Sequence, residues 1–271
     1  MNVVKYQRQA SVIKTHDHKA NSWLLLLERI KASVANDYKL LSFDVYGTLI
    51  DWETGVLENG KSVASQSDKS REDLLRIYSE LEKIQQVKTP DMPYSKLCAT
   101  VYPQFAERLR VSVKPTVQES EVFGQSVGNW PAFPDTVDAL RRLKKHFKLV
   151  VLSNVDRESF KVSHAGSLQD SHFDKIITAQ DVGSYKPDPK NFEYMFKTVK
   201  QEFGVEQNQI LQTAQSQFHD HHPARKIGLK SVWIERRGTM GNLKEQVYDW
   251  KFVTLGDMAD AVEKEVAAQF Q

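Results

Sequence analysis

Short runs of apolar residues alternate with amphipathic stretches along the chain from Tyr38 onward. Alternation of this kind is typical of a parallel sheet covered by helices. It predicts six strands, at residues 39–45, 148–152, 175–179, 209–214, 230–235 and 251–254. The stretch 134–146 carries apolar residues on one helical face and basic residues on the other, which predicts a surface helix. We therefore expect an α/β fold built on a doubly wound parallel sheet.

One long stretch interrupts this alternation. Between Glu53 and Asn129 there is no pattern of a buried strand, and the apolar residues recur at helical spacing, as in Leu74, Leu75, Tyr78, Leu81 and Ile84. A helical insertion of this length directly after the first strand predicts a small cap domain above the sheet edge. The sequence thus divides into an N-terminal extension (1–37), an α/β core (38–55 and 131–271) and a helical cap (56–130).

Composition excludes several classes of protein. The chain has 271 residues, of which 40 % are hydrophobic and 27 % charged, as in ordinary globular proteins. A net charge of +2 gives no electrostatic reason to expect a nucleic-acid partner, and no apolar run approaches the roughly 18 residues of a membrane span. Cys98 is the single cysteine, which rules out an intrachain disulfide, and we expect an inert buried thiol. These features predict a cytoplasmic protein, with Asp17 arguing against a targeting segment at the basic N-terminus.

Asp44 is the first candidate for chemistry. It follows the first predicted strand and precedes a turn at Gly47. Open α/β sheets bind ligands at the carboxyl ends of their strands, so the carboxylate would face a substrate as a nucleophile or a metal ligand. Aspartate at a strand end is equally typical of a simple turn, and position alone does not decide between these two roles.

Three segments taken together resemble the leading motifs of the haloacid dehalogenase superfamily. They are D-V-Y-G-T-L at 44–49, L-S-N at 152–154 and S-Y-K-P-D-P at 184–189. Phosphatases of that superfamily carry a second aspartate two residues after the nucleophile, to protonate the leaving group, and here that position is Tyr46. A phenol with an ordinary pKa of about 10 is a poor acid at neutral pH, whereas halide leaves as a stable anion. The resemblance is therefore to the type II (S)-2-haloacid dehalogenases, hydrolases of carbon–halide bonds.

The resemblance implies roles for several residues. Asp44 would attack the 2-carbon of a small 2-haloalkanoic acid, expel halide with inversion and form an ester that water then hydrolyses. Lys186 would hold this carboxylate ionised and oriented, and Asp220 would place or activate the water. Ser153 and Asn154, together with Tyr46, would bind the substrate, with the first two receiving its carboxylate.

The fourth motif departs from the family pattern. The family resembles S-S-N-x-x-D, but residues 215–220 read Q-S-Q-F-H-D. Gln215 and Gln217 would take over substrate contacts from serine and asparagine, which puts water positioning and substrate range in doubt. The family also draws an arginine from the insertion to receive the halide, and Arg76 is the expected residue. Phe192 stands where many relatives have tyrosine.

No cofactor is expected. His219 and His222 share the i, i+3 spacing of a chelating pair on a helix, but the sequence offers no third ligand. Asp44 and Asp220 resemble two ligands of the magnesium-dependent phosphatases, yet hard-cation sites usually use more carboxylates. Trp233 is expected in the core, while Trp52, just after the nucleophile loop, could line the pocket.

The best-supported reading is a hydrolase that releases halide from a small carboxylic acid, with no nucleic-acid or membrane partner. Three alternatives stay open: a hydrolase that opens a strained carbon–nitrogen ring beside a carboxylate, a magnesium-dependent phosphatase, and a catalytically silent protein that keeps the fold. The first would need a nearby acid, because an amine is a poor leaving group unless protonated or strained. A homodimer is compatible with the sequence, which does not decide the oligomeric state.

Overall fold

A computed structural model describes residues 38–238 and 246–268 of the chain. The expected N-terminal extension, and with it the question of a targeting segment, lies outside the described residues. Among the helices that are described, none is long and apolar enough to cross a membrane.

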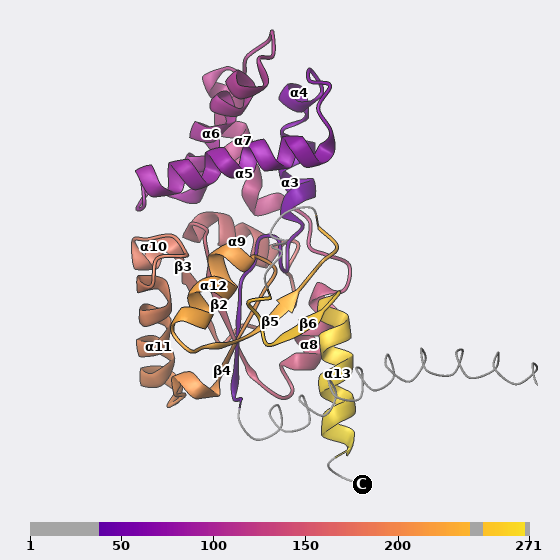
Figure 1. Cartoon of the computed structure of the whole chain (residues 1–271), viewed down its shortest axis with the longest axis vertical. Helices are drawn as coiled ribbons and strands as arrows, with labels where there is room; N and C mark the ends of the chain where they lie inside the picture. The colour runs from indigo at the N-terminus through magenta and orange to yellow at the C-terminus, as the bar shows by residue number, and fades with distance from the viewer. Residues whose placement is uncertain (1–37, 239–245, 269–271) are drawn as a thin grey trace, which may run out of the picture.

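The centre of the molecule is a six-stranded sheet in which each paired neighbour is parallel (Figure 1). The strand order is β3-β2-β1-β4-β5-β6, so the chain winds outward in both directions from β1. This confirms the doubly wound sheet. The bounds agree with the six predicted strands to within a few residues: β1 Leu40–Phe43, β2 Lys148–Ser153, β3 Lys175–Thr178, β4 Ile210–Ala214, β5 Lys230–Ile234 and β6 Trp250–Phe252.

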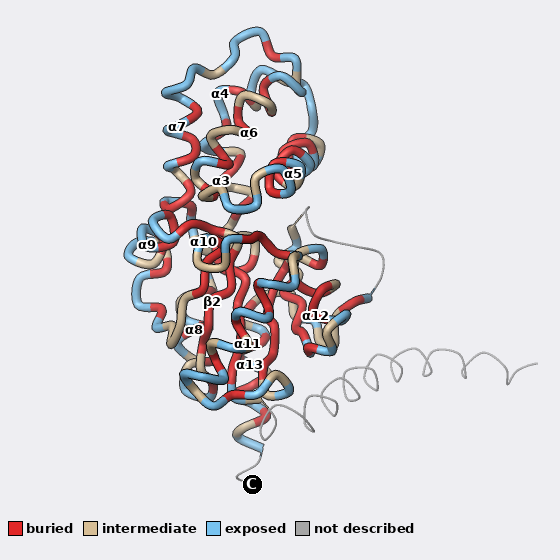
Figure 2. The backbone as a smooth tube through the Cα atoms, turned by 90° about the vertical axis from the view of Figure 1, so that its left-hand side faces the viewer, coloured by how far each residue is buried: buried red, intermediate tan, exposed pale blue. Residues whose placement is uncertain are grey.

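Helices cover both faces of the sheet, and successive strand residues feed two separate apolar clusters. Leu41 faces the cluster that includes helices α8 and α13, whereas Leu40 faces the cluster that includes α11 and α12. This division follows from the two-residue side-chain period of a strand, and Figure 2 shows the buried backbone running through the sheet. The helices of this layer are α8 Thr136–Leu143, α9 Arg157–Ala165, α10 Ala179–Val182, α11 Lys190–Phe203, α12 His222–Lys226 and α13 Leu255–Ala268.

A group of helices, here called the cap, stands above the carboxyl edge of the sheet (Figure 1). Its members are α3 Trp52–Asn59, α4 Lys61–Ala64, α5 Arg71–Lys88, α6 Tyr94–Leu109, α7 Val117–Gln125 and the short 3-10 helix η1 Ser126–Asn129. The chain enters and leaves the cap along one path, since Ile50 bridges to Ala132 and the Asp51 N–H donates to the Pro131 carbonyl at 2.8 Å. The helical insertion is thus present, while the domain boundaries at 55/56 and 130/131 stay a prediction.

Helix α5 departs from its sequence pattern in a way that matters for the site. It begins at Ser70, whose side chain accepts the Asp73 N–H, and it buries Leu74, Leu75, Tyr78 and Leu81 as expected. Ile84, however, is 58 % exposed, so the expected apolar stripe is wrong there. The buried face continues instead through polar residues, namely Glu82, Gln85 and Gln86. Buried polar groups normally need partners or a task, which draws attention to this side of α5.

Candidate active site

Asp44 follows β1 directly and is held at the tip of the strand by the backbone. Its N–H donates to the Thr213 carbonyl of the neighbouring strand at 3.1 Å. The chain then turns sharply at Gly47, whose φ of +97° suits glycine and strains other residues. Within this turn the Thr48 hydroxyl donates to Asp44 Oδ2 at 2.7 Å. One carboxylate oxygen is thereby fixed by a residue four positions further along the chain.

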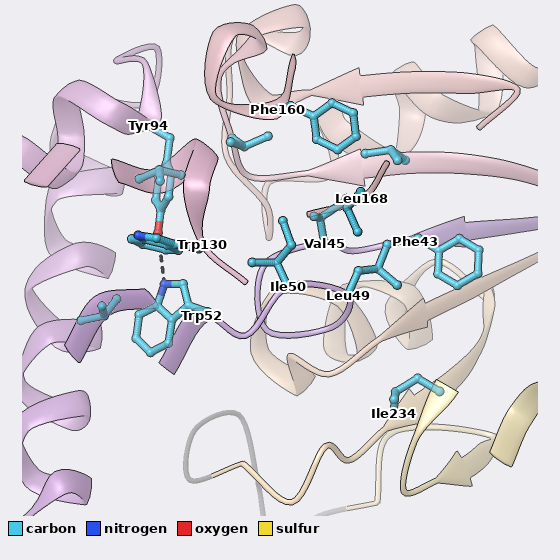
Figure 3. Packing of buried hydrophobic residues seen from close by; sticks show 14 of the residues in the cluster. Phe43, Val45, Leu49, Ile50, Trp52, Tyr94, Trp130, Phe160, Leu168 and Ile234 are labelled. Carbon is cyan, nitrogen blue, oxygen red and sulfur yellow. Dashed lines mark hydrogen bonds between the residues drawn. The ribbon is translucent and has the colours of Figure 1, made fainter. Parts of the chain in front are cut away.

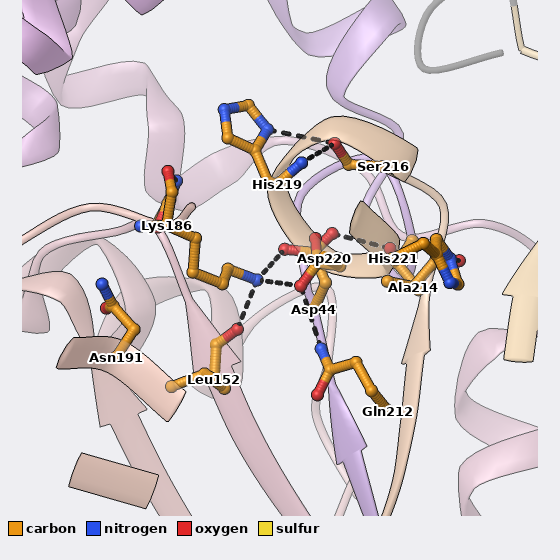
Figure 4. Close-up of polar contacts among 12 residues, drawn as sticks. Asp44, Leu152, Lys186, Asn191, Gln212, Ala214, Ser216, His219, Asp220 and His221 are labelled. Atoms are coloured by element: carbon orange, nitrogen blue, oxygen red, sulfur yellow. Dashed lines mark hydrogen bonds and ion pairs between the residues drawn. The ribbon is translucent and has the colours of Figure 1, made fainter. Parts of the chain in front are cut away.

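Lys186 fixes the other oxygen of Asp44, from a loop after β3 (Figure 4). Its ammonium group donates to Asp44 Oδ1 at 3.0 Å, to Asp220 Oδ1 at 2.6 Å and to the Leu152 carbonyl at 2.8 Å. The side chain is only 1 % exposed. Although burial opposes the charge, the two carboxylates raise the pKa of Lys186 above its ordinary value, so it stays protonated.

Asp220 lies behind this pair, on a π-helical turn formed by Gln217–His221. It is fully buried, and Gln212 also donates to its Oδ1 at 2.9 Å. Burial and the nearby negative charge of Asp44 raise the pKa of Asp220, while Lys186 opposes them. Two carboxylates therefore share one ammonium group, an arrangement that favours a mobile proton near neutral pH.

A cavity of about 260 Å³ opens between the cap and the carboxyl edge of the sheet. Five of the nine expected site residues line it: Asp44, Tyr46, Ser153, Asn154 and Gln215. Lys186 and Asp220 do not line the cavity, and they act on it through Asp44. The remaining two, Arg76 and Gln217, also lie outside its lining.

Ser153 and Asn154 have different surroundings at the end of β2. The Ser153 hydroxyl is buried and has no hydrogen-bond partner among the described residues, which leaves it available to a ligand. The Asn154 side chain is already engaged: its Nδ2 donates to the Lys186 carbonyl at 3.0 Å, and its Oδ1 accepts the Lys186 N–H at 2.7 Å. Its side-chain amide thus positions the lysine rather than a substrate.

Tyr46 contributes an aromatic face rather than an acid. Its ring packs edge-on against Trp130, with 5.9 Å between centroids, and its hydroxyl pairs with the Ser163 hydroxyl at 2.8 Å. Burial raises the pKa of Tyr46 further above its ordinary value of 10. This phenol therefore cannot act as the acid that phosphatases carry two residues after the nucleophile.

The structure does not bring two of the expected substrate contacts, Arg76 and Gln217, to the cavity. Arg76 lies on the outer side of α5, where its side chain is 53 % exposed and pairs with Asp73 at 3.0 Å and Glu80 at 3.1 Å. The helical phase turns it away from the cavity, which Arg71 lines instead while paired with Glu53 at 2.5 Å. Gln217 is fully buried beneath the cavity rather than on it, because the π-helical turn directs it inward.

His219, one of the two histidines with the spacing of a chelating pair, already has a hydroxyl partner on one ring nitrogen. His219 lines the cavity and its Nδ1 pairs with the Ser216 hydroxyl at 3.0 Å; burial, Lys186 and Lys83 lower its pKa to about 3. His221 is held by Ser231 and the Ala214 carbonyl, both at 2.9 Å. Within the described residues no group of three histidine, cysteine or acidic side chains is placed to hold a metal. The donor set also fits a hard cation poorly, because the Lys186 ammonium group lies between Asp44 and Asp220.

The chain is similar to known proteins in both sequence and fold. A family model described as haloacid dehalogenase-like hydrolase matches residues 38–210. The chain belongs to this hydrolase family. It is 33 % identical over 134 residues to (S)-2-haloacid dehalogenase of Pseudomonas sp. strain YL, a match that covers 48 % of this chain and only 55 % of that enzyme. It is 23 % identical over 206 residues to (S)-2-haloacid dehalogenase 4A of Burkholderia cepacia, covering 72 % of this chain and 82 % of that one.

A solved structure supports the same fold for the hydrolase. The L-2-haloacid dehalogenase of Xanthobacter autotrophicus with chloropropionic acid covalently bound superimposes with a TM-score of 0.66 at 17 % identity. The alignment covers 83 % of this chain and 98 % of that one. At this level of identity the likeness establishes the architecture, and the chemistry rests on the residues themselves.

Several residues around the candidate site were not predicted from the sequence. Thr48 was visible as the T of the first motif, but no role was assigned to it. Arg236 becomes apparent only after folding: it donates to the Thr48 carbonyl at 2.7 Å and pairs with Asp135 at 2.6 Å, so it ties the nucleophile loop to the start of α8. Glu82 and Lys83 line the cavity from α5, and their helical positions would have suggested them had the phase of α5 been known.

Among the other residues considered, Phe192 is buried in the core beneath the sheet and has no place in the site. Trp233 is a core residue as expected, and its indole N–H donates to the Gln215 carbonyl at 2.8 Å. Trp52 lines the cavity, which confirms that expectation, and Cys98 is a fully buried free thiol.

Proposed function

We propose that this chain hydrolyses small 2-haloalkanoic acids, releasing halide and a 2-hydroxy acid through an ester with Asp44. The observation that carries the proposal is the Asp44 carboxylate, which Thr48 and Lys186 hold by separate oxygens at the wall of a small cavity. A nucleophile needs this kind of fixed orientation, because misplacement by about 1 Å can reduce the rate about 100-fold. The (S)-2-haloacid dehalogenases among its relatives support the same assignment.

In the first step Asp44 attacks the 2-carbon of the substrate, and the carbon–halogen bond breaks with its electron pair leaving on the halide. The unpartnered Ser153 hydroxyl would donate to the substrate carboxylate at the carboxyl end of β2. Tyr46 and Trp52 would enclose the carbon chain with their rings. No proton is required, which is consistent with an aromatic residue at position 46.

In the second step water attacks the carbonyl carbon of the ester, and the bond between that carbon and the substrate oxygen breaks. Asp220 does not line the cavity, so it would accept the first proton of the water through the Lys186 ammonium group; that proton then passes to the substrate oxygen as it leaves, and the second is lost to solvent as Asp44 ionises. The raised pKa of Asp220, which results from burial and from Asp44, suits a base that works near neutral pH. The 2-hydroxy acid then leaves, and Asp44 is again a carboxylate.

A cation in the cavity would receive the anionic parts of the substrate. Arg71 pairs with Glu53, and Arg236 with Asp135. Lys83 differs, since its ammonium group rests 4.9 Å from the centre of the Phe218 ring, and no ion pair with a carboxylate is found for it in the described part of the chain. We assign Lys83 as the residue that takes the place expected of Arg76.

The experiment is a halide-release assay over a panel of 2-haloacids, with a generic phosphate ester beside it, in the presence and absence of a chelator. Halide release should be unaffected by the chelator, because no step of the proposed reaction uses a metal and the Lys186 ammonium group already pairs with both carboxylates. Asp44→Asn should abolish release while leaving the fold intact, since the substitution removes the nucleophile with little change in volume. Phosphate release that needs added magnesium would favour a phosphatase, and inactivity on every substrate would favour a silent protein.

A further inference from the structure

Glu82 is a buried acid in the wall of the cavity that halide release does not use. It lies on α5 in the cap, is 5 % exposed, and lines the same cavity as Asp44. No ion pair with a lysine or arginine is found for it within the described residues. Buried acids without a basic partner are rare in protein cores, so a functional role at the cavity is the first explanation to test.

The polarity of its hydrogen bonds is determined by Trp52. The indole N–H can only donate, and it donates to the Tyr94 hydroxyl oxygen at 3.2 Å (Figure 3). The Tyr94 hydroxyl hydrogen therefore points to Glu82, whose Oε1 accepts it. This oxygen is an acceptor in either protonation state, and a proton on the carboxyl group of Glu82 belongs on its second oxygen.

The surroundings of Glu82 keep a substantial fraction of its carboxyl group protonated at neutral pH. Burial raises its pKa to about 7, while the bond from Tyr94 and the charge of Lys83 only partly oppose this. The other titratable groups that interact electrostatically with Glu82 carry no charge when they are protonated. They are Tyr78, Tyr94, Cys98 and Tyr185. A carboxylic acid in this range can both give up a proton and recover it in each turnover.

We propose that Glu82 is a general acid, and that the site opens oxirane-2-carboxylates as well as 2-haloacids. The proposal rests on the proposed role of Asp44 as the nucleophile. Asp44 would attack the 2-carbon, the bond from that carbon to the ring oxygen would break, and the oxygen would take the proton of Glu82. Water would then hydrolyse the ester and release a 2,3-dihydroxy acid. One proton of this water protonates the released 2-hydroxyl group, and the other returns to Glu82.

The choice of a ring oxygen follows from its chemistry. A halide leaves without a proton, and the protonation that a ring amine needs is already in place at neutral pH on its own nitrogen, so neither leaving group calls on Glu82. An oxirane oxygen is too weakly basic to arrive protonated, yet it leaves as an alkoxide, which needs one. Strain in the three-membered ring weakens the bond to be broken. The cavity volume of about 260 Å³ suits a molecule of this size.

The test compares two substrates, 2-chloropropionate and oxirane-2-carboxylate, with the full-length protein. Wild type should release chloride from the first and form 2,3-dihydroxypropanoate from the second. Glu82→Gln should reduce ring opening about 100-fold or more, the usual contribution of a general acid, and reduce chloride release by a clearly smaller factor. The matched control is Glu80→Gln, an exposed position on the same helix, which should affect neither rate.

A pH profile separates an acid from a structural residue. Ring opening should fall above about pH 7 as Glu82 loses its proton. Tyr94→Phe removes a hydrogen bond that lowers the pKa of Glu82, so the loss of ring opening should move to higher pH in this variant. Tyr94→Phe also keeps the test available if Glu82→Gln fails to fold.

Chloride release without ring opening would overturn the proposal for Glu82 and leave the proposed function standing. Equal losses on both substrates in Glu82→Gln would also overturn it. Ring opening that depends on Glu82, without chloride release, would instead contradict the proposed halide chemistry. If wild type acts on neither substrate, both proposals fail.

Discussion

At the scale of single residues, three side chains make Asp44 different from an aspartate in an ordinary turn. Thr48 and Lys186 each donate a hydrogen bond to one of its oxygens, and Lys186 also donates to Asp220. If Lys186 paired with Asp44 alone, the buried site would be electrically neutral. Because the carboxylates of Asp44 and Asp220 share this one ammonium group, the site has an excess of negative charge. The site can therefore store both a nucleophile and a base for the second step.

Lys186→Met is expected to reduce turnover about 100-fold or more, because it removes the charge that holds both carboxylates. The pKa of Asp220, already raised by burial, would rise further once its opposing cation is lost. More alkaline conditions are then needed to deprotonate this base, so the remaining activity should shift to higher pH. The measurement is kcat against pH; a profile with the height and position of wild type would show that Lys186 is only part of a turn.

Lys83→Gln is expected to raise KM for a 2-haloacid about tenfold, equal to about 1.4 kcal/mol of lost binding. The reason is that Lys83 is assigned to the anionic parts of the substrate, while Asp44 and Lys186 are untouched. Lys88→Gln, on the exposed end of the same helix, is the control. Steady-state kinetics on both variants decides the matter, and an unaltered KM in Lys83→Gln would remove that residue from the site.

At the scale of elements, the start of α3 holds the cap against the nucleophile loop through one close contact. A side-chain Cβ at Gly55 would lie 2.3 Å from the Trp130 ring, a distance that forces something to shift. Trp130 in turn packs on Tyr46, two residues from the nucleophile. The absence of a side chain at Gly55 therefore lets the cap lie close above the catalytic loop.

Gly55→Ala is expected to lower the free energy of unfolding by about 1–3 kcal/mol through overpacking against Trp130. Glu58→Ala, exposed on the same helix, should leave stability within about 0.5 kcal/mol of wild type. Urea unfolding followed by tryptophan fluorescence measures both. If the two variants proved equally stable, the contact with Trp130 would have no bearing on how the cap is held.

At the scale of the whole molecule, the central strands of the sheet could be predicted because burial on both faces leaves an apolar run in each of them. Lys186, which touches Asp44 from a recognisable motif, could be predicted too, whereas the contact from Thr48 was not. The side chains of the cap wall could not be predicted, since Arg76 was chosen from the family resemblance rather than from the buried face of α5, and Glu82 and Lys83 were left unassigned. Arg236 was not predicted because it contacts Thr48 from 188 positions away in the sequence. The predictions of a cytoplasmic location and of a homodimer stay predictions.

The central claim is that the oxygen delivered to the product passes through Asp44. A single turnover with enzyme in excess over a 2-haloacid, carried out in water enriched in oxygen-18, tests it most directly. Our account predicts that the heavy oxygen appears in the peptide that contains Asp44, and that the first product carries ordinary oxygen from the carboxylate. Heavy oxygen in the first product, with none in that peptide, would show that water attacks the substrate directly and would contradict the account.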